Sequence, residues 1–211
     1  VSNALVQNAK TCPDNCGLCN LHLSHTGLAN LDLTNRCNMR CPICFANANQ
    51  AGYVYEPSYE EVVKMLETLR AEKPVPCTAV QFSGGEPTVR KKDLIRLCEM
   101  HPDCAFLAFT NGTLIDVAFA DEMLRVKNFV PAISIEGFEE ATDGRRGQGT
   151  YQKVLDTMKL LQKKKLPFGI SLCYTRDNAE VIGSDAYIDE MIALGAKFAW
   201  FFTYIPVGVG A

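Results

Sequence analysis

Three cysteines between residues 37 and 44 are spaced to hold a metal cluster. Cys37, Cys41 and Cys44 follow the pattern C-x3-C-x2-C, so their thiols come from one short loop. Cysteine thiolates are the usual ligands of four-iron clusters, and three of them leave one iron open for another ligand. The alternatives are a zinc site that takes a fourth ligand from Cys12–Cys19, or thiols with a structural role.

A second triplet with the same spacing lies nearer the N-terminus. Cys12, Cys16 and Cys19 again give C-x3-C-x2-C, and His22 and His25 follow them. The repeated ligand spacing predicts a second metal centre. We expect a second iron–sulfur cluster here, with a zinc knuckle of three cysteines and one histidine as the alternative.

The composition indicates a folded protein with no nucleic-acid partner and no transmembrane segment. The 211 residues are 47% hydrophobic and 21% charged, which suits one large domain with a hydrophobic core. A net charge of -3 gives no electrostatic reason to expect a nucleic-acid partner. No apolar run approaches the roughly 20 residues of a transmembrane span, and the N-terminus lacks the layout of a secretory signal. We therefore expect a cytoplasmic chain whose cysteines are ligands rather than disulfides.

From residue 28 onward, short β-rich runs alternate with segments of helical periodicity. This alternation is typical of βα units around a parallel sheet, and the continuous apolar runs predict strands buried on both faces. Six such units are fewer than the eight of a closed barrel, so we expect an α/β fold, a partial (β/α)6 TIM-like barrel. The expected strands are Leu28–Thr34, Thr78–Ser83, Ala105–Thr110, Val130–Ile135, Phe168–Tyr174 and Lys197–Tyr204.

Three of the expected helices have clear signals. Ser58 and Glu61 form a capping box before the first of them. Ser184 is expected to cap the last one and Gly195 to end it. The residues expected to face inward are Tyr59, Val62, Val63, Leu66 and Leu69, then Tyr151, Val154, Leu155, Met158 and Leu161, and finally Ile188, Met191 and Ile192.

The chain divides into two expected parts. Residues 1–27 are rich in cysteine and lack periodicity, so we expect a small metal-binding cap. Residues 28–211 are expected to form the barrel. Because the chain stops just after the sixth expected strand, we expect a further C-terminal domain in the whole protein.

Polar motifs follow the expected strands, at the edge where barrel active sites lie. Ser83–Thr88 follows the second strand with the sequence SGGEPT, in which two glycines expose backbone to a close ligand and the proline stops the strand. Arg145 and Arg146 precede a helix. An arginine fork matches a carboxylate, so one of the pair is a candidate for holding an anionic group, with a solvated loop as the alternative.

With its cysteine triplet directly after the first expected strand and GGEP after the second, the stretch 28–208 resembles the radical S-adenosylmethionine (SAM) superfamily. The resemblance implies a [4Fe-4S] cluster whose open iron chelates the amino and carboxylate groups of SAM. It implies that an electron from the reduced cluster cleaves SAM to methionine and a 5′-deoxyadenosyl radical, which abstracts hydrogen from a substrate carbon. An electron donor such as ferredoxin or flavodoxin is implied as well.

The same resemblance suggests which residues contact SAM. Ile43 stands where the family often has an aromatic residue beside the adenine, and Phe45 is expected to compensate. Leu172 is expected against the adenine, with a buried core leucine as the alternative. The remaining candidates are Gly84, Gly85, Glu86 and Pro87 for the amino group, Ser134 and Glu136 for the ribose or methionyl end, Asn111 as support, and Arg145 for the carboxylate.

Residues 12–49 resemble the N-terminus of tetraether lipid synthase-like radical SAM proteins, which carry auxiliary iron–sulfur clusters. This resemblance implies hydrogen abstraction from an unactivated carbon, such as one in a lipid chain, for C–C or C–S bond formation. The alternative enzyme is one that methylates or otherwise modifies a pterin, a peptide or another small molecule. A zinc-organised binding module on a degenerate barrel is the non-enzymatic alternative, and the intact GGEP motif speaks against it.

Overall fold

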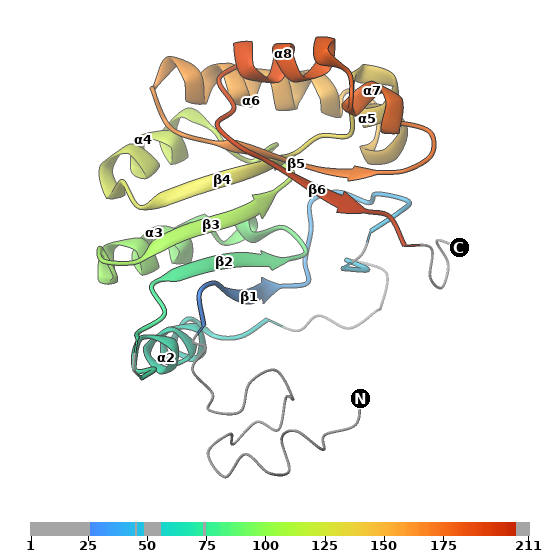
Figure 1. Ribbon diagram of the computed structural model, residues 1–211. Coiled ribbons are helices and arrows are strands. Elements are labelled where there is room, and N and C mark those ends of the chain that lie inside the picture. Colours follow the sequence, from blue (N-terminus) through green and yellow to red (C-terminus); the bar gives the residue numbers. More distant parts are fainter. Residues whose placement is uncertain (1–25, 45, 49–55, 74, 206–211) are drawn as a thin grey trace.

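Six parallel strands form one sheet in the computed structural model, which describes residues 26–44, 46–48, 56–73 and 75–205 (Figure 1). The strands pair in sequence order, β1-β2-β3-β4-β5-β6, as consecutive βα units predict. This confirms the α/β partial barrel. The strands are β1 (Ala29–Thr34), β2 (Ala79–Gly84), β3 (Ala105–Thr110), β4 (Phe129–Ser134), β5 (Gly169–Tyr174) and β6 (Ala199–Thr203).

Helices between the strands cover one face of the sheet (Figure 1). The hydrophobic core lies between these helices and the sheet, where the rings of Phe82 and Phe106 stack with centroids 5.4 Å apart. None of the helices in the described residues is long and apolar enough to cross a membrane. The helices are α2 (Tyr59–Arg70), η1 (Pro87–Arg90), α3 (Lys91–Met100), α4 (Val117–Val126), α5 (Glu139–Arg146), α6 (Thr150–Lys163), α7 (Ala179–Ile182) and α8 (Asp185–Ala193).

The predicted helix ends are confirmed. Glu61 N donates to Ser58 Oγ at 3.1 Å and Ser58 N donates to Glu61 Oε2 at 2.7 Å, which completes the capping box of α2. Ser184 Oγ accepts from Tyr187 N at 3.3 Å at the start of α8. Gly195 follows the end of α8 with a φ of 102°, a left-handed conformation that glycine adopts easily.

The predicted inward face of α8 is wrong in one position. Ile192 is 63% exposed, whereas Tyr187 is fully buried and its ring meets Phe138 edge-on at 5.4 Å. Tyr187 and Met191 lie one helical turn apart, so they define the buried stripe of α8 and Ile192 falls beside it. The aromatic ring of Tyr187 buries more apolar area than an isoleucine can, which sets the rotation of the helix.

The sixth strand is also less buried than its apolar sequence predicts. Every residue of β6 is exposed, because the sheet has no further strand beside it and no helix in the described residues covers it. The expectation that this strand is buried on both faces is therefore wrong for these residues.

The sheet is strongly curved. Phe109 on β3 contacts Trp200 and Phe202 on β6 with ring centroids 5.4 Å apart in each case. In a flat sheet, strands three positions apart are separated by about 14 Å. The rings therefore meet across the hollow of the sheet, and the helices lie on its convex side. We call the other side, which carries Phe109, Trp200 and Phe202, the concave face.

Candidate functional site

The cysteine triplet lies on the loop that leaves β1, on the side to which all six strands point (Figure 1). Cys37, Cys41 and Cys44 are half-buried and form no disulfide. Burial raises the pKa of Cys37, and the nearby Glu86 and the other two thiols raise it further. Burial also raises the pKa of Cys41. Deprotonating these half-buried thiols costs free energy unless a positive charge lies beside them. Bound iron supplies that charge, so the three thiols fit an iron–sulfur cluster.

The three thiols do not form a site for a single metal ion. Among the described residues, no three acidic, histidine or cysteine side chains are placed to hold one ion. A mononuclear zinc site needs its thiolates about 2.3 Å from one centre. A four-iron cluster instead binds each of three thiolates through a different iron.

The two glycines after β2 allow this segment to touch the cysteine loop. Gly85 N donates to the Thr34 carbonyl at 2.6 Å, and Glu86 N donates to the Arg36 carbonyl at 2.8 Å. A Cβ on Gly84 would lie 2.2 Å from the Thr34 oxygen, and one on Gly85 would lie 2.2 Å from the Arg36 oxygen. The space beside each glycine is thus filled by the β1 loop. The missing side chains of the two glycines thus make room for the backbone that leads to the cysteines.

Glu86 joins the ends of β2 and β3. Its carboxylate is 1% exposed and accepts from Thr110 Oγ1 at 2.7 Å, Asn111 N at 2.7 Å and Thr88 N at 3.0 Å, as well as from the Thr88 hydroxyl. Pro87 begins η1 directly after it. Because the carboxylate oxygens of Glu86 already accept these hydrogen bonds, any contact between SAM and residues 84–87 is expected to involve their backbone.

Asn111 reaches from the end of β3 to the cysteine loop. Its Nδ2 donates to Asn38 Oδ1 at 2.8 Å and lies 3.9 Å from Cys37 Sγ. Its Oδ1 accepts from Thr113 N at 3.0 Å. Asn111 is therefore placed to support the cluster loop, beside a sulfur atom.

Glu136 gathers two arginines at the end of β4. Its carboxylate is 1% exposed, and Arg146 Nε donates to Oε1 at 3.0 Å. Arg145 Nη1 lies 2.6 Å from Oε2, an ion pair whose angle is not that of a hydrogen bond, and Cys173 N donates to the same oxygen at 3.0 Å. Both arginines lower the pKa of Cys41, so the group lies near the cluster loop. One carboxylate and two guanidinium groups leave a net positive charge there.

The remaining residues predicted to contact SAM differ in where they lie and in how exposed they are. Ser134 ends β4 beside Ser171 of β5 and is partly exposed. Ile43 is 36% exposed on the cysteine loop. Leu172 is 0% exposed in the core between sheet and helices, so the expected adenine contact gives way to the alternative of a core leucine. Phe45 lies outside the described residues, as does the triplet with its two following histidines, Cys12, Cys16, Cys19, His22 and His25.

Arg90 is a positioning residue that sequence reasoning missed. Its side chain is 8% exposed, and Nη1 donates to the Leu33 carbonyl at 2.9 Å and to the Pro57 carbonyl at 2.6 Å. It thereby ties η1 to the end of β1, next to the cysteine loop. The available signal was a basic residue four positions after Glu86, which alone does not distinguish a buried arginine from a surface one.

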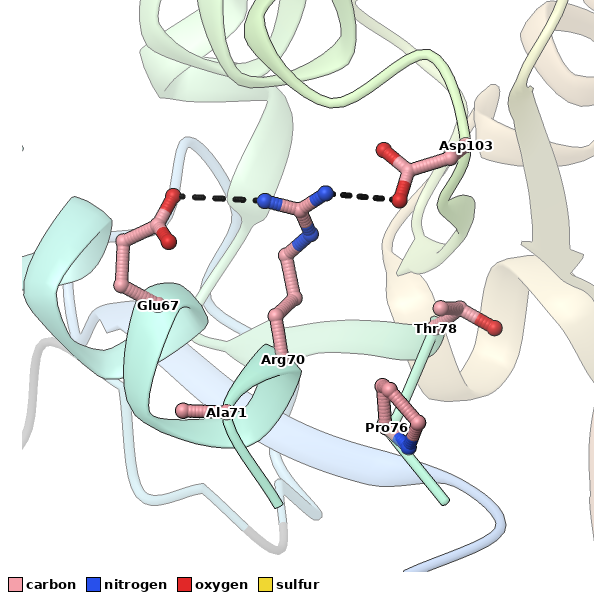
Figure 2. Close-up of a pocket in the computed structure, with 6 residues that line it drawn as sticks. All are labelled: Glu67, Arg70, Ala71, Pro76, Thr78 and Asp103. Carbon is pink, nitrogen blue, oxygen red and sulfur yellow. Dashed lines mark hydrogen bonds and ion pairs between the residues drawn. The ribbon is translucent and has the colours of Figure 1, made fainter. Parts of the chain in front are cut away.

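A pocket of about 280 Å³ lies at the opposite ends of the strands, where Thr78 precedes β2 and Asp103 precedes β3. Figure 2 shows Arg70 between Glu67 and Asp103, with N···O distances of 3.5 and 2.6 Å. The two carboxylates outnumber the one guanidinium and leave a net negative charge, and none of the predicted site residues lies here. This pocket is therefore not the functional site.

Comparisons with known proteins agree with this geometry. The family model described as "Radical SAM superfamily" matches residues 31–182. The 7,8-dihydro-6-hydroxymethylpterin dimethyltransferase of Methanocaldococcus jannaschii is 57% identical over 115 residues, which are 53% of this chain and 22% of that protein. The Fe-coproporphyrin III synthase of Methanosarcina barkeri is 32% identical over 155 residues, 72% of this chain and 38% of that protein. The chain thus spans well under two thirds of the length of these relatives.

Solved structures show the same fold. The structure of Streptococcus suis SuiB bound to S-adenosylmethionine has a TM-score of 0.74 at 19% identity, over 89% of this chain and 43% of that one. Native anSMEcpe with bound AdoMet has a TM-score of 0.70 at 25% identity, over 85% of this chain and 52% of that one. With its family model, cysteine loop and curved parallel sheet, the chain belongs to the radical SAM superfamily of iron–sulfur enzymes.

Proposed function

We propose that this chain is the radical-generating part of an enzyme that methylates a pterin-type heterocycle. The observation that carries the proposal is the 57% identity over 115 residues to a pterin dimethyltransferase, far above the 32% shared with a porphyrin-forming relative. A match at that level covers about half of the chain, so it includes much of the barrel. The pterin alternative predicted from sequence is thereby preferred.

Cys37, Cys41 and Cys44 are assigned to a [4Fe-4S] cluster and SAM to the rim around them. When bound, and reduced by a donor such as ferredoxin or flavodoxin, the cluster would supply the electron for cleavage of SAM to methionine and a 5′-deoxyadenosyl radical. Asn111 holds the loop of Cys37 through Asn38.

Arg145 and Arg146 are assigned to the carboxylate of SAM. Glu136 holds both guanidinium groups, and the net positive charge of the three side chains suits an anionic group beside the cluster. Ser134, at the end of β4, is assigned to the ribose. The backbone of Gly84–Pro87 is assigned to the SAM amino group.

The N-terminal triplet and the lipid substrate also remain predictions. We propose that Cys12, Cys16 and Cys19 hold a second iron–sulfur cluster, on the strength of the repeated ligand spacing. Removing the three together is expected to lower the iron content by about four atoms per chain. Loss of one zinc and no iron would favour the zinc knuckle instead. No relative reported above is named for a lipid, so a lipid chain has less support than a pterin.

The proposal is tested with the full-length protein, reconstituted anaerobically with iron and sulfide. It is incubated with SAM, a strong reductant and 7,8-dihydro-6-hydroxymethylpterin, and the pterins are analysed by mass spectrometry. We expect a product heavier by one or two methylene units that depends on SAM and reductant. An unmodified pterin, in a sample that does form 5′-deoxyadenosine, would rule out this substrate while leaving the radical chemistry in place.

A further inference from the structure

The concave face of the sheet carries a group of polar side chains below the rim. Gln81 Nε2 donates to Asn30 Oδ1 at 2.9 Å, and the Ser83 hydroxyl lies 2.9 Å from the same oxygen. The Ser83 hydroxyl also contacts Asp32 Oδ1. Their neighbours along β2, Val80 and Phe82, point into the core on the helix side, so these four polar residues face the other way.

Asp32 is the acceptor that this group leaves available. Its side chain is exposed, and no described residue donates to Oδ2. Asn30 Nδ2 approaches Oδ1 only at 3.5 Å. Among the concave-face positions of the described strands, Asp32 is the one carboxylate. The group as a whole therefore offers an anionic, acceptor-rich edge.

An aromatic wall lies on the same face. Phe109 meets Trp200 and Phe202 edge-on, and the last two rings lie 6.3 Å apart at an angle of 29°. Trp200 is 37% exposed and Phe202 is 42% exposed, although both lie on the inner side of the sheet. Exposed aromatic faces of this kind stack on planar rings.

The strand register brings the polar edge and the aromatic wall together. Asp32 pairs with Ser83, and the pairing of Phe82 with Ala108 puts Ser83 beside Phe109 on the next strand. Asp32 and Phe109 are thus two strand spacings apart, about 10 Å. That distance suits a fused bicyclic ring that stacks at one end and is hydrogen-bonded along its edge.

Beyond Phe109, the concave positions of β4 and β5 carry small side chains, among them Ala132, Ser134 and Ser171. The Phe198 ring occupies the space beside Gly169, where a Cβ would lie 2.3 Å from it, and so extends the aromatic wall. Parallel sheets are normally covered on both faces, so an exposed inner face with polar and aromatic groups is a place for a ligand.

From this juxtaposition we infer that Asp32 binds the donor edge of a planar nitrogen heterocycle that stacks against Phe109, Trp200 and Phe202. The inference rests on the proposed function, because it names the substrate subsite of that reaction. In a pterin, the 2-amino group and the neighbouring ring N–H form two adjacent donors, which match the two oxygens of a carboxylate. Asn30 and Gln81 are placed to contact the flanking ring atoms.

The fluorescence of Trp200 provides the test, since it is the single tryptophan in the chain. The reconstituted chain, with SAM present throughout, is excited at the tryptophan wavelength and titrated with three probes. Pterin and guanosine share the two-donor edge, whereas lumazine has an oxo group in place of the 2-amino group. Asp32→Asn keeps the shape and removes the charge, and Asp156→Asn is the matched control, since Asp156 is an exposed residue of α6. Iron content and circular dichroism are measured for each variant.

We expect pterin to quench Trp200 and to bind at least about tenfold more weakly to Asp32→Asn, as loss of a charged hydrogen bond predicts. Lumazine should bind more weakly than pterin to the parent and change little on the substitution. Asp156→Asn should match the parent. Asp32→Ser, which removes the carboxylate and shortens the side chain, serves as the second variant if Asp32→Asn loses iron.

The outcomes separate the inference from the proposed function. Equal pterin affinity in parent and Asp32→Asn would overturn the role of Asp32 and leave the pterin reaction standing. Binding of guanosine but not pterin, with the same dependence on Asp32, would support the subsite and overturn the pterin substrate. If neither probe binds the parent, the inference is wrong, and the mass spectrometric assay decides the proposed function separately.

Discussion

Asn111 Nδ2 lies 3.9 Å from Cys37 Sγ and 2.8 Å from Asn38 Oδ1, so one amide group from β3 contacts a cluster thiol and the residue that follows it. Hydrogen bonds to the sulfur atoms are among the factors that set the potential of an iron–sulfur cluster. Here the hydrogen-bond donor comes from Asn111, which lies outside the cysteine loop.

Replacing Asn111 by alanine should therefore lower the reduction potential of the cluster, on the order of tens of millivolts, because a donor to the thiolate is lost. The potential is measured by an EPR-monitored redox titration of the reconstituted chain. Thr113→Val is the control, since it removes the hydroxyl that contacts Asn111 Oδ1 and Asn38 Nδ2 but keeps the Asn111 Nδ2 donor. Identical potentials in parent and Asn111→Ala would show that the amide does not reach the sulfur.

Replacing Gly85 by alanine should reduce the amount of iron bound. The new Cβ would lie 2.2 Å from the Arg36 carbonyl oxygen and 2.8 Å from the Asn35 carbonyl carbon, so the cysteine loop must move. Gly144→Ala in α5 is the matched control, because a Cβ there meets nothing within 4 Å. Iron per chain is measured after anaerobic reconstitution. Equal iron in both variants would contradict the close contact between the two loops.

Replacing Glu86 by glutamine should destabilise the fold by about 1.5–3 kcal/mol, because the amide turns a donor toward the buried N–H and hydroxyl groups that the carboxylate accepts. For a chain of this size, each kcal/mol corresponds to about 2–4 °C in Tm. Thermal unfolding monitored by circular dichroism checks this. The control is Glu60→Gln, at an exposed position of α2. Equal Tm values for the Glu86→Gln and Glu60→Gln variants would show that the buried carboxylate does not stabilise the contact between β2 and β3.

Cys98 should resist alkylation in the folded chain up to high pH. Burial raises the pKa of Cys98 from 9.0 to about 12, so near pH 8 it holds roughly a thousandfold less thiolate than an ordinary cysteine. Its labelling should rise only as the pH approaches 12. Mass spectrometry after brief iodoacetamide treatment, with the urea-unfolded chain as control, measures this. Labelling of Cys98 at pH 8 as fast as in urea would contradict its burial.

Much of the fold was predictable because local patterns agree with the global arrangement. The apolar runs identify all six strands within two residues, and the capping signals at Ser58 and Ser184 lie where the helices begin. The rotation of α8 was not predictable from periodicity alone. Ile192 and Tyr187 are both apolar candidates for the buried stripe, and the packing of Tyr187 against Phe138 decides between them.

The sequence indicates the candidate ligands of the site more readily than its contacts. Spacing alone singles out Cys37, Cys41 and Cys44 as candidate ligands, but it does not show that Gly85 makes room for Arg36, which depends on the register of β1 and β2. The role that we infer for Asp32 was not predicted from the sequence either. Its signal was the alternation of polar and apolar residues in β1, which indicates one exposed face and one buried face.

The most direct test of the central claim is the formation of 5′-deoxyadenosine by the anaerobically reconstituted chain with SAM and a strong reductant. The parent should form it, and a variant with Cys37, Cys41 and Cys44 replaced by alanine should form none. A variant with Cys12, Cys16 and Cys19 replaced should retain it, since these cysteines are assigned to a separate cluster. A colourless parent that binds stoichiometric zinc and leaves SAM intact would contradict the account.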